Sequence, residues 1–132
     1  MNREYLLDTH VWLWGLVDPG RLRKKTRALL TGPDATLWLS PISVWETSLL
    51  VKRGRLELDT DPHTWIRDAI VSSGVGEVPL NHEVAFQSRE LKLKHDDPAD
   101  RFLAATASVY QLALVTADDR LLRGQGYETI RA

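Results

Sequence analysis

The chain has 132 residues, 43% of them hydrophobic, and its 17 basic residues nearly balance 18 acidic ones. This length and composition predict one folded domain over residues 1–132, and the net charge of −1 argues neither for nor against a nucleic-acid partner. The absence of cysteine excludes disulfides and thiolate metal sites, and no apolar run approaches the roughly 20 residues of a membrane helix, so we expect a cytoplasmic protein without a membrane segment.

Apolar strands and helices alternate along the chain. Strands are expected at residues 4–8, 35–40, 76–80, 112–116 and 127–132. Helices are expected at residues 21–30, 40–54, 61–74, 81–93 and 97–111. Two of these helices have clear capping residues, because Ser40 precedes Pro41 and Asp97 precedes Pro98. The alternation predicts an α/β fold: a central, mostly parallel sheet of four to five strands with helices on both faces.

Two acidic residues follow expected strands directly. Asp8 ends the apolar run Tyr5-Leu6-Leu7, and Asp118 lies two residues after the strand LALVT. In open α/β sheets, functional sites form at the carboxyl ends of the strands. We therefore expect both carboxylates at the same edge of the sheet.

Two further acids lie in the early turns of expected helices. Glu46 falls within the arc that faces the core in the 40–54 helix, and Asp100 shares a face with small residues in the 97–111 helix. The core stripe of the 40–54 helix is expected to consist of Ile42, Trp45 and Leu49. Asp8, Glu46, Asp100 and Asp118 can then meet at one end of the sheet.

Converging carboxylates need a partner of opposite charge. Two of them about 4 Å apart repel by about 4 kcal/mol at an effective dielectric of 20, which is large beside a total stability of roughly 5–15 kcal/mol. A pocket of oxygen ligands suits Mg²⁺ or Mn²⁺, and such ions polarise phosphodiesters and activate water. The four acids therefore indicate a metal-dependent hydrolytic site.

Each acid also has a simpler interpretation. Asp8 or Asp118 alone is more often a helix cap than a metal ligand. Glu46 could extend its carboxylate to solvent or pair with Lys52 or another basic residue, and Asp100 could pair with its neighbour Arg101. The joint pattern of four acids is much less expected by chance than any single one.

Four stretches together resemble the PIN-domain ribonucleases, specifically the VapC-like toxins of type II toxin–antitoxin pairs: LLDTHVWLW, LSPISVWE, HDDPADRFLAATA and LVTADDRLL. They follow one another in the order of that family and cover nearly the whole chain. DPADR with a downstream TADDRL is the more specific part of the resemblance, whereas LLDT alone is weak.

The resemblance implies roles for particular residues. Asp8, Asp100 and Asp118 correspond to metal-binding acids, and Glu46 to the fourth acid, acting directly or through a metal-bound water. Thr9 and Thr116 occupy positions whose hydroxyls orient a carboxylate or a water. Two more acids nearby, Asp97 and Asp119, leave open which of them touch metal, although Asp97 is expected to be the cap ahead of Pro98.

The resemblance also implies partners. It predicts hydrolysis of RNA, usually structured RNA such as transfer RNA, a homodimer, and a VapB-like antitoxin whose tail covers the acidic groove. Two basic stretches could contact RNA phosphates, although a solvated helix face is their simpler interpretation. Their residues are Arg21, Arg23, Lys24, Lys25, Lys52 and Arg53. His10 is expected to be structural, and His82 and His95 have no informative spacing.

Two alternatives to the ribonuclease hypothesis remain open. A phosphate-monoester hydrolase or a receiver-type phosphoacceptor also places acids at strand ends. A haloacid-dehalogenase-like enzyme would need a second Asp two residues after Asp8, where His10 stands, and no P-loop is present. The third hypothesis is a catalytically silent PIN-like module that only binds a partner.

Overall fold

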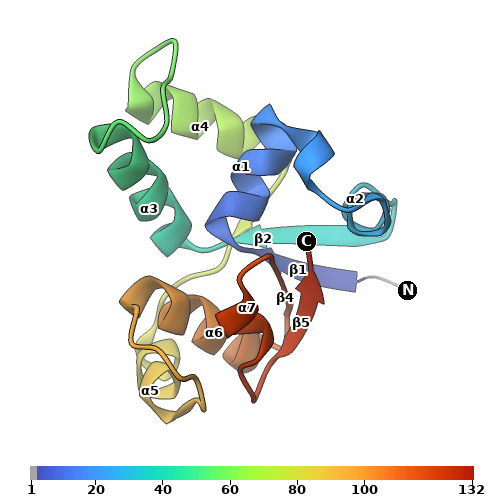
Figure 1. Ribbon diagram of the computed structural model, residues 1–132, viewed down its shortest axis with the longest axis vertical. Coiled ribbons are helices and arrows are strands. Elements are labelled where there is room, and N and C mark those ends of the chain that lie inside the picture. The colour runs from blue at the N-terminus through green and yellow to red at the C-terminus, as the bar shows by residue number, and fades with distance from the viewer. Residues whose placement is uncertain (1–2) are drawn as a thin grey trace.

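A computed structural model describes residues 3–132 of the chain (Figure 1). The domain expected over 1–132 therefore starts with two residues that lie outside the described part. The strands are β1 Arg3–Leu7, β2 Ala35–Leu39, β3 Gly76–Glu77, β4 Ala113–Thr116 and β5 Glu128–Arg131. The helices are α1 Thr9–Val17, α2 Lys24–Leu30, α3 Pro41–Lys52, α4 Pro62–Ser73, α5 His82–Glu90, α6 Pro98–Tyr110 and α7 Asp119–Leu122, with a 3₁₀ turn, η1, at Pro19–Arg21.

The five strands form one sheet in the order β3-β2-β1-β4-β5. Each neighbouring pair is parallel, so the carboxyl ends of all strands lie at one edge of the sheet. The prediction of an α/β domain with a parallel sheet of four to five strands is confirmed. None of the helices in residues 3–132 is long and apolar enough to span a bilayer.

Successive side chains of the central strands point to opposite faces of the sheet, so a separate hydrophobic core forms on each face. Tyr5 and Leu7 of β1 pack with α1 and α4, whereas Leu6 packs on the opposite face with α5 and α6. In β4, Val115 belongs to the first core and Leu114 to the second. Figure 1 shows α1 and α4 on one side of the sheet and α5 and α6 on the other, as expected for helices on both faces.

The expected capping residues position the helices that matter for the site. The Ser40 hydroxyl accepts from the backbone N–H of Ile42 at the start of α3. The Asp97 carboxylate accepts from the N–H groups of Ala99 and Asp100 at the start of α6, which confirms its role as a cap. Both helices thus begin near the carboxyl edge of the sheet.

Some expected elements are shorter in the structure. The predicted 21–30 helix divides because Leu22 is extended, and its N–H closes the 3₁₀ turn on Pro19 before α2 begins at Lys24. The predicted 81–93 helix ends at Glu90, and the 76–80 strand keeps only two paired residues. The loop that follows α5 is therefore longer than expected.

The predicted core stripe of α3 is wrong at Trp45. Trp45 is 56% exposed, while Ser43 and Thr47 of the same helix are fully buried. The small polar residues of α3 face the protein interior because this helix packs close to the amino end of α1. At this contact the Thr9 hydroxyl lies 2.9 Å from Ser43 Oγ. This orientation brings Glu46, the neighbour of Trp45, to the edge of the sheet.

Candidate active site

Asp8 joins the ends of two neighbouring strands. One carboxylate oxygen, Oδ1, accepts from the backbone N–H of Thr9 at 2.7 Å, so Asp8 caps α1. The other, Oδ2, accepts from the Thr116 hydroxyl at the end of β4, also at 2.7 Å. Asp8 is only 8% exposed. Burial raises the pKa of its carboxyl group, and repulsion from Asp100 raises it further, although the two hydrogen bonds lower it.

Glu46 approaches the same point from α3. The Thr9 hydroxyl donates to Glu46 Oε1 at 2.6 Å, so Thr9 links this carboxyl group to the residue next to Asp8. Burial, with repulsion from Asp8 and Asp100, raises the pKa of Glu46 to about 7 despite the hydrogen bond from Thr9. Glu46 therefore exchanges a proton near neutral pH when no cation balances the acids.

Asp100 lies one turn into α6 and faces the acids at the strand ends. Its Oδ2 atom accepts from His95 Nε2 at 2.9 Å, and the side chain is 13% exposed. Burial raises the pKa of Asp100, because it outweighs the hydrogen bond from His95. The carboxylate is thus held in place by a loop residue five positions earlier.

Asp118 is the most exposed of the four acids. It caps α7 through the N–H of Arg120, and the Arg120 guanidinium lies 3.2 Å from its Oδ2. Partial burial opposes ionisation of Asp118, but the hydrogen bonds from Arg120 hold its pKa below the usual value. Arg120 also approaches Asp100 Oδ2, at 3.9 Å, so one cation borders two of the acids.

The four predicted acids line a single hollow of about 340 Å³. They come from four different segments of the chain, and Asp97, His10, Trp14 and Arg120 complete most of the lining. The repulsion among the carboxylates and the all-oxygen donor set fit a hard divalent cation. Asp8 keeps lone pairs for a ligand even with both oxygens hydrogen-bonded, because each carboxylate oxygen accepts more than one bond.

The tightest group of ligand atoms differs in part from the predicted set. Within the described residues, side-chain ligand atoms of His95, Asp100 and Asp118 lie within 4.8 Å of one another. His95 Nε2 points at the Asp100 carboxylate, so its proton serves that hydrogen bond and leaves no lone pair for a metal at this atom. We therefore interpret His95 as a residue that orients Asp100.

The simpler interpretations of two acids do not fit the structure. Arg101 does not pair with Asp100: its buried guanidinium donates to carbonyl oxygens at the end of α5 and in the segment that follows it. Glu46 bonds to Thr9 and not to Lys52. Asp119 forms an ion pair with Arg131 at 2.9 Å and does not line the hollow, whereas Asp97 does.

The six predicted RNA-contacting cations are all exposed, at Arg21, Arg23, Lys24, Lys25, Lys52 and Arg53. One of them, Arg21, contacts a residue that lines the acidic hollow: its guanidinium stacks over the ring of Trp14 with 4.5 Å between the guanidinium carbon and the ring centre. The sequence interpretation missed His95 and Arg120. His95 lies on a loop five residues before Asp100, and no sequence pattern marks it as part of the site. For Arg120, the only indication in the sequence is its position directly after Asp118 and Asp119.

Comparisons with known proteins show the family to which the chain belongs. The model of the family described as PIN domain matches residues 5–126. The chain belongs to the PIN-domain family. Within it, ribonuclease VapC22 of Mycobacterium tuberculosis is 32% identical over 117 residues, which is 88% of each chain. The resemblance to VapC-like PIN proteins is thereby confirmed.

Several solved structures share the fold of this chain. VapBC2 from Rickettsia felis, solved with a DNA fragment from the promoter, has a TM-score of 0.74 at 17% identity and 98% coverage of both chains. VapBC-5 from Mycobacterium tuberculosis has a TM-score of 0.65 at 19% identity, again with 98% of both chains covered. FitAcB from Neisseria gonorrhoeae has a TM-score of 0.58 at 24% identity and 89% coverage of both chains. At these identities the likeness establishes the PIN fold of this chain.

Proposed function

We propose that this PIN domain is a Mg²⁺- or Mn²⁺-dependent endoribonuclease and the toxin of a type II toxin–antitoxin pair. The observation that carries the proposal is the single hollow lined by Asp8, Glu46, Asp100 and Asp118. The relationship to a protein named ribonuclease VapC22 supports RNA as the substrate.

Asp8, Asp100 and Asp118 are the proposed metal ligands, with Glu46 as the fourth acid. A bound divalent cation would supply polarisation of the phosphodiester and activation of the attacking water. The chain's own contribution is to hold the carboxylates in a fixed arrangement. Thr116 fixes Asp8, Thr9 fixes Glu46, and these two threonines are fully buried, so the carboxylates they hold have little freedom to turn.

Glu46 is the residue best suited to move a proton. Its pKa of about 7 lies in the range where a side chain both accepts and releases protons readily. Thr9 occupies Oε1, so Oε2 is the atom that we propose takes up a proton from the attacking water. A cation in the hollow would stabilise the ionised form of Glu46 and favour this role at neutral pH.

The geometry of Asp8 argues against the phosphoacceptor alternative. A nucleophilic carboxylate needs an oxygen free to attack phosphorus, but Oδ1 and Oδ2 of Asp8 both accept short hydrogen bonds. Such bonds lower the nucleophilicity of the oxygens, whereas they are compatible with metal ligation. We therefore favour hydrolysis by water over transfer of phosphate to Asp8.

The proposed partners follow from the same relatives. A VapB-like antitoxin is the expected inhibitor, because the solved structures of similar fold include VapBC complexes. Exposed apolar side chains such as Trp45, Val71 and Phe86 offer contact area for an antitoxin or for a second copy in a homodimer. We place the protein in the cytoplasm, where it would meet structured RNA such as transfer RNA.

RNA cleavage by the purified protein tests the proposal. We expect cleavage of total RNA in Mg²⁺ or Mn²⁺, loss of cleavage in excess EDTA, and recovery when the metal is restored. The Asp8→Asn variant, prepared identically, controls for a contaminating nuclease and should be inactive. Undiminished cleavage in EDTA would refute the metal dependence, and a folded protein inactive on every RNA in Mg²⁺ and Mn²⁺ would favour the silent binding module.

A further inference from the structure

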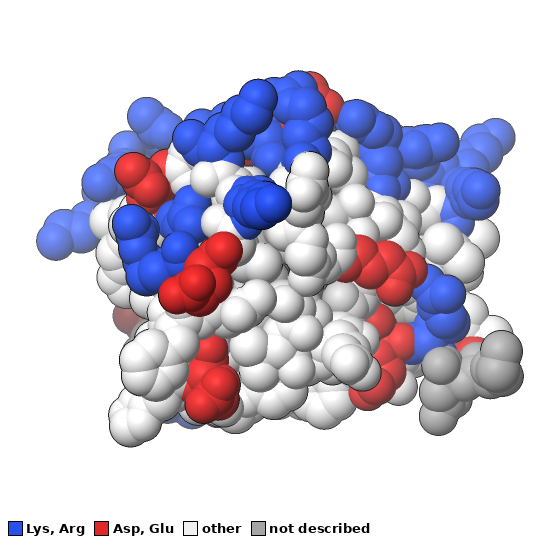
Figure 2. Space-filling model, turned by 90° about the horizontal axis from the view of Figure 1, so that it is seen from below, with Lys and Arg blue, Asp and Glu red and all other residues white. Residues whose placement is uncertain are grey.

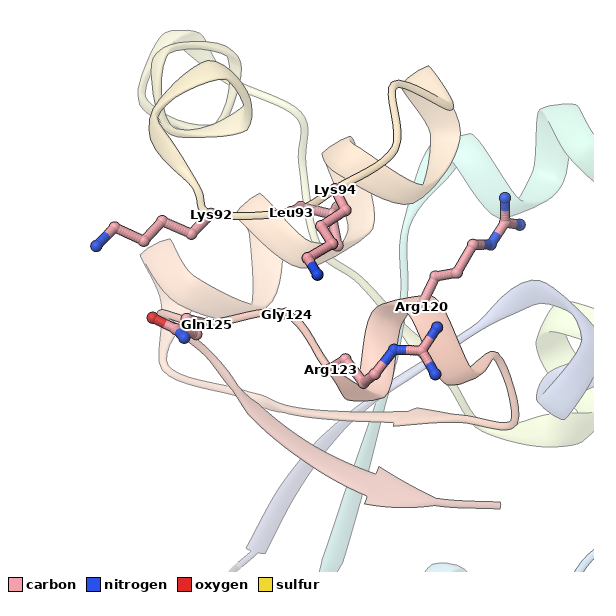
Figure 3. A pocket seen from close by; sticks show the side chains of 7 residues that line it. All are labelled: Lys92, Leu93, Lys94, Arg120, Arg123, Gly124 and Gln125. Atoms are coloured by element: carbon pink, nitrogen blue, oxygen red, sulfur yellow. The ribbon is translucent and has the colours of Figure 1, made fainter.

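A second hollow, of about 640 Å³, lies next to the acidic one and is lined by cations (Figure 3). Two segments that are far apart in the sequence form it: Lys92 to Lys94 after α5, and residues of the stretch from Arg120 in α7 to Gln125. Its charged lining residues are Lys92, Lys94, Arg120 and Arg123. No acidic residue is among the lining residues, in contrast to the hollow beside it.

We propose that this basic hollow binds the phosphodiester backbone of the RNA strand beyond the site of cleavage. The inference rests on the ribonuclease function proposed above and names a binding surface for its substrate. It differs from the sequence prediction, because the six cations expected to contact RNA all belong to other parts of the chain.

Three of the cations are available for a phosphate. Lys92, Lys94 and Arg123 are exposed, and none of them forms an ion pair with another residue in the range 3–132. In Figure 3, the Lys94 side chain extends from its loop toward the segment at Gly124 that follows α7, and Arg123 extends from the end of that helix. Cations grouped without carboxylates create a positive potential that an anionic ligand would neutralise.

The walls of the hollow are held in place by the protein interior. Arg101 is buried and donates to the carbonyl oxygens of Leu91, Leu93 and His95, which fixes the path of the loop that carries Lys92 and Lys94. The N–H of Gln125 bonds to the carbonyl oxygen of Lys92 at 3.2 Å and ties the two walls together. The cations therefore project from ordered backbone.

Arg120 connects the two hollows, since it lines both of them. Its guanidinium contacts Asp118 at 3.2 Å in the acidic hollow, while Arg123 and Gly124, which directly follow its helix, line the basic hollow. An RNA strand with a phosphate at the acids can continue past Arg120 and meet Lys94 and Arg123 with later phosphates. Figure 2, the molecule seen from below, shows Lys and Arg side chains in a band along one edge, and clustered cations of this kind are typical of surfaces that follow a nucleic-acid backbone.

An acidic peptide, for example from an antitoxin, is the alternative ligand. The lining favours RNA, because Leu93 is its only large apolar side chain and a peptide interface of useful affinity needs buried apolar anchors. Phosphate contacts by Lys and Arg need no such anchor. The basic hollow is also continuous with the proposed cleavage site, and this continuity favours RNA over a peptide as its ligand.

Binding of a fluorescent 12-nucleotide single-stranded RNA, measured by anisotropy in EDTA over a range of salt concentrations, tests the proposal. The variant is Lys94→Gln/Arg123→Gln, and the control with the same charge change is Arg55→Gln/Arg67→Gln, whose residues are exposed and outside both hollows. We expect the first variant to bind about tenfold or more weakly and to lose about 1.4 from the slope of log affinity against log salt, as for two phosphate contacts. The control should stay close to the parent.

Cleavage assays separate this proposal from the proposed function. With Mg²⁺, the variant should show a raised KM on the 12-mer and parental turnover of a dinucleotide, which is too short to span both hollows. Parental RNA affinity and salt slope in the variant would overturn the binding surface even if both proteins cleave RNA. A decameric Glu peptide that binds the parent more tightly than the RNA, and loses that affinity in the variant, would overturn it in favour of a protein ligand. Failure of the parent to cleave any RNA would instead refute the ribonuclease function, while the anisotropy data would still decide the surface.

Discussion

Thr116 and Asp8 are 108 residues apart in the chain, and the hydroxyl of the first donates to the carboxylate of the second at 2.7 Å. The same hydroxyl oxygen accepts from the backbone N–H of Asp118 at 3.1 Å. One buried side chain thus positions two of the proposed metal ligands at the ends of neighbouring parallel strands.

Replacing Thr116 by Val keeps the shape of the side chain and removes both hydrogen bonds. We expect the free energy of unfolding to fall by about 1–3 kcal/mol, because a buried carboxylate loses its donor. Stabilisation by Mg²⁺ should also weaken. Thr106→Val is the control: Thr106 is equally buried, but within residues 3–132 its hydroxyl bonds only to the carbonyl oxygen of Phe102 in α6. Urea unfolding that gives the two variants equal losses and equal Mg²⁺ responses would contradict this role of Thr116.

Glu46 predicts how the metal-free protein responds to pH. Its pKa rises from 4.5 to about 7 on folding, so the folded state binds more protons than the unfolded state between these values. The contribution of Glu46 to stability is therefore fully present below about pH 4.5 and is lost as pH rises toward 7. After screening by solvent at this half-buried side chain, the loss is roughly 1–2 kcal/mol.

The stability of the Glu46→Gln variant should change less with pH over the same range, because an amide does not titrate. Thermal melts in EDTA at several pH values measure the difference. A variant whose stability falls between pH 4.5 and 7 as steeply as that of the parent would show that Glu46 is not the titrating group.

Arg101 is expected to stabilise the fold and not to act in catalysis. Its side chain donates to four carbonyl oxygens, those of Ser88, Leu91, Leu93 and His95. Arg101→Met leaves these acceptors without a donor and should lower the free energy of unfolding by roughly 3–5 kcal/mol. Arg89→Met, at an exposed site with a 3.8 Å contact to Asp96, should change it by less than about 1 kcal/mol. Similar urea midpoints for the two variants would contradict this view of Arg101.

Growth of a bacterial host tests the proposed toxin activity. Induced expression of the parent should arrest growth, and Asp118→Asn should restore it because a neutral amide is a weaker ligand for a hard cation. Asp59→Asn, at an exposed position outside the hollow, should remain as toxic as the parent. Normal growth with soluble, folded parent protein would count against the toxin assignment.

Local patterns were sufficient to predict the framework of the site. The apolar run before Asp8 and the apolar strand before Asp118 predicted two buried parallel strands, and their carboxyl ends do meet. The cap at Asp97 was likewise predicted, because capping depends on residues adjacent in sequence.

The errors and omissions concern side-chain direction and contacts across the chain. Trp45 fits an apolar stripe, yet the contact of Thr9 with Glu46 turns it outward. The contact between His95 and Asp100 depends on a loop whose path is set by Arg101, and the sequence suggested a pair between Arg101 and Asp100. The hollow formed by residues 92–94 and 120–125 exists only after folding, so neighbouring residues gave no signal for it.

The central claim is that the four acids converge on a divalent cation, and the Asp100→Asn variant tests it most directly. The substitution keeps the shape and an oxygen acceptor for His95 while removing one charge from the hollow. In EDTA, thermal melts should show the variant as stable as the parent, or more stable by on the order of 1 kcal/mol after solvent screening, because repulsion is relieved. Mg²⁺ should raise the melting temperature of the parent and that of the variant much less. A variant that is clearly less stable in EDTA, with the full Mg²⁺ response of the parent, would contradict a metal site at Asp100.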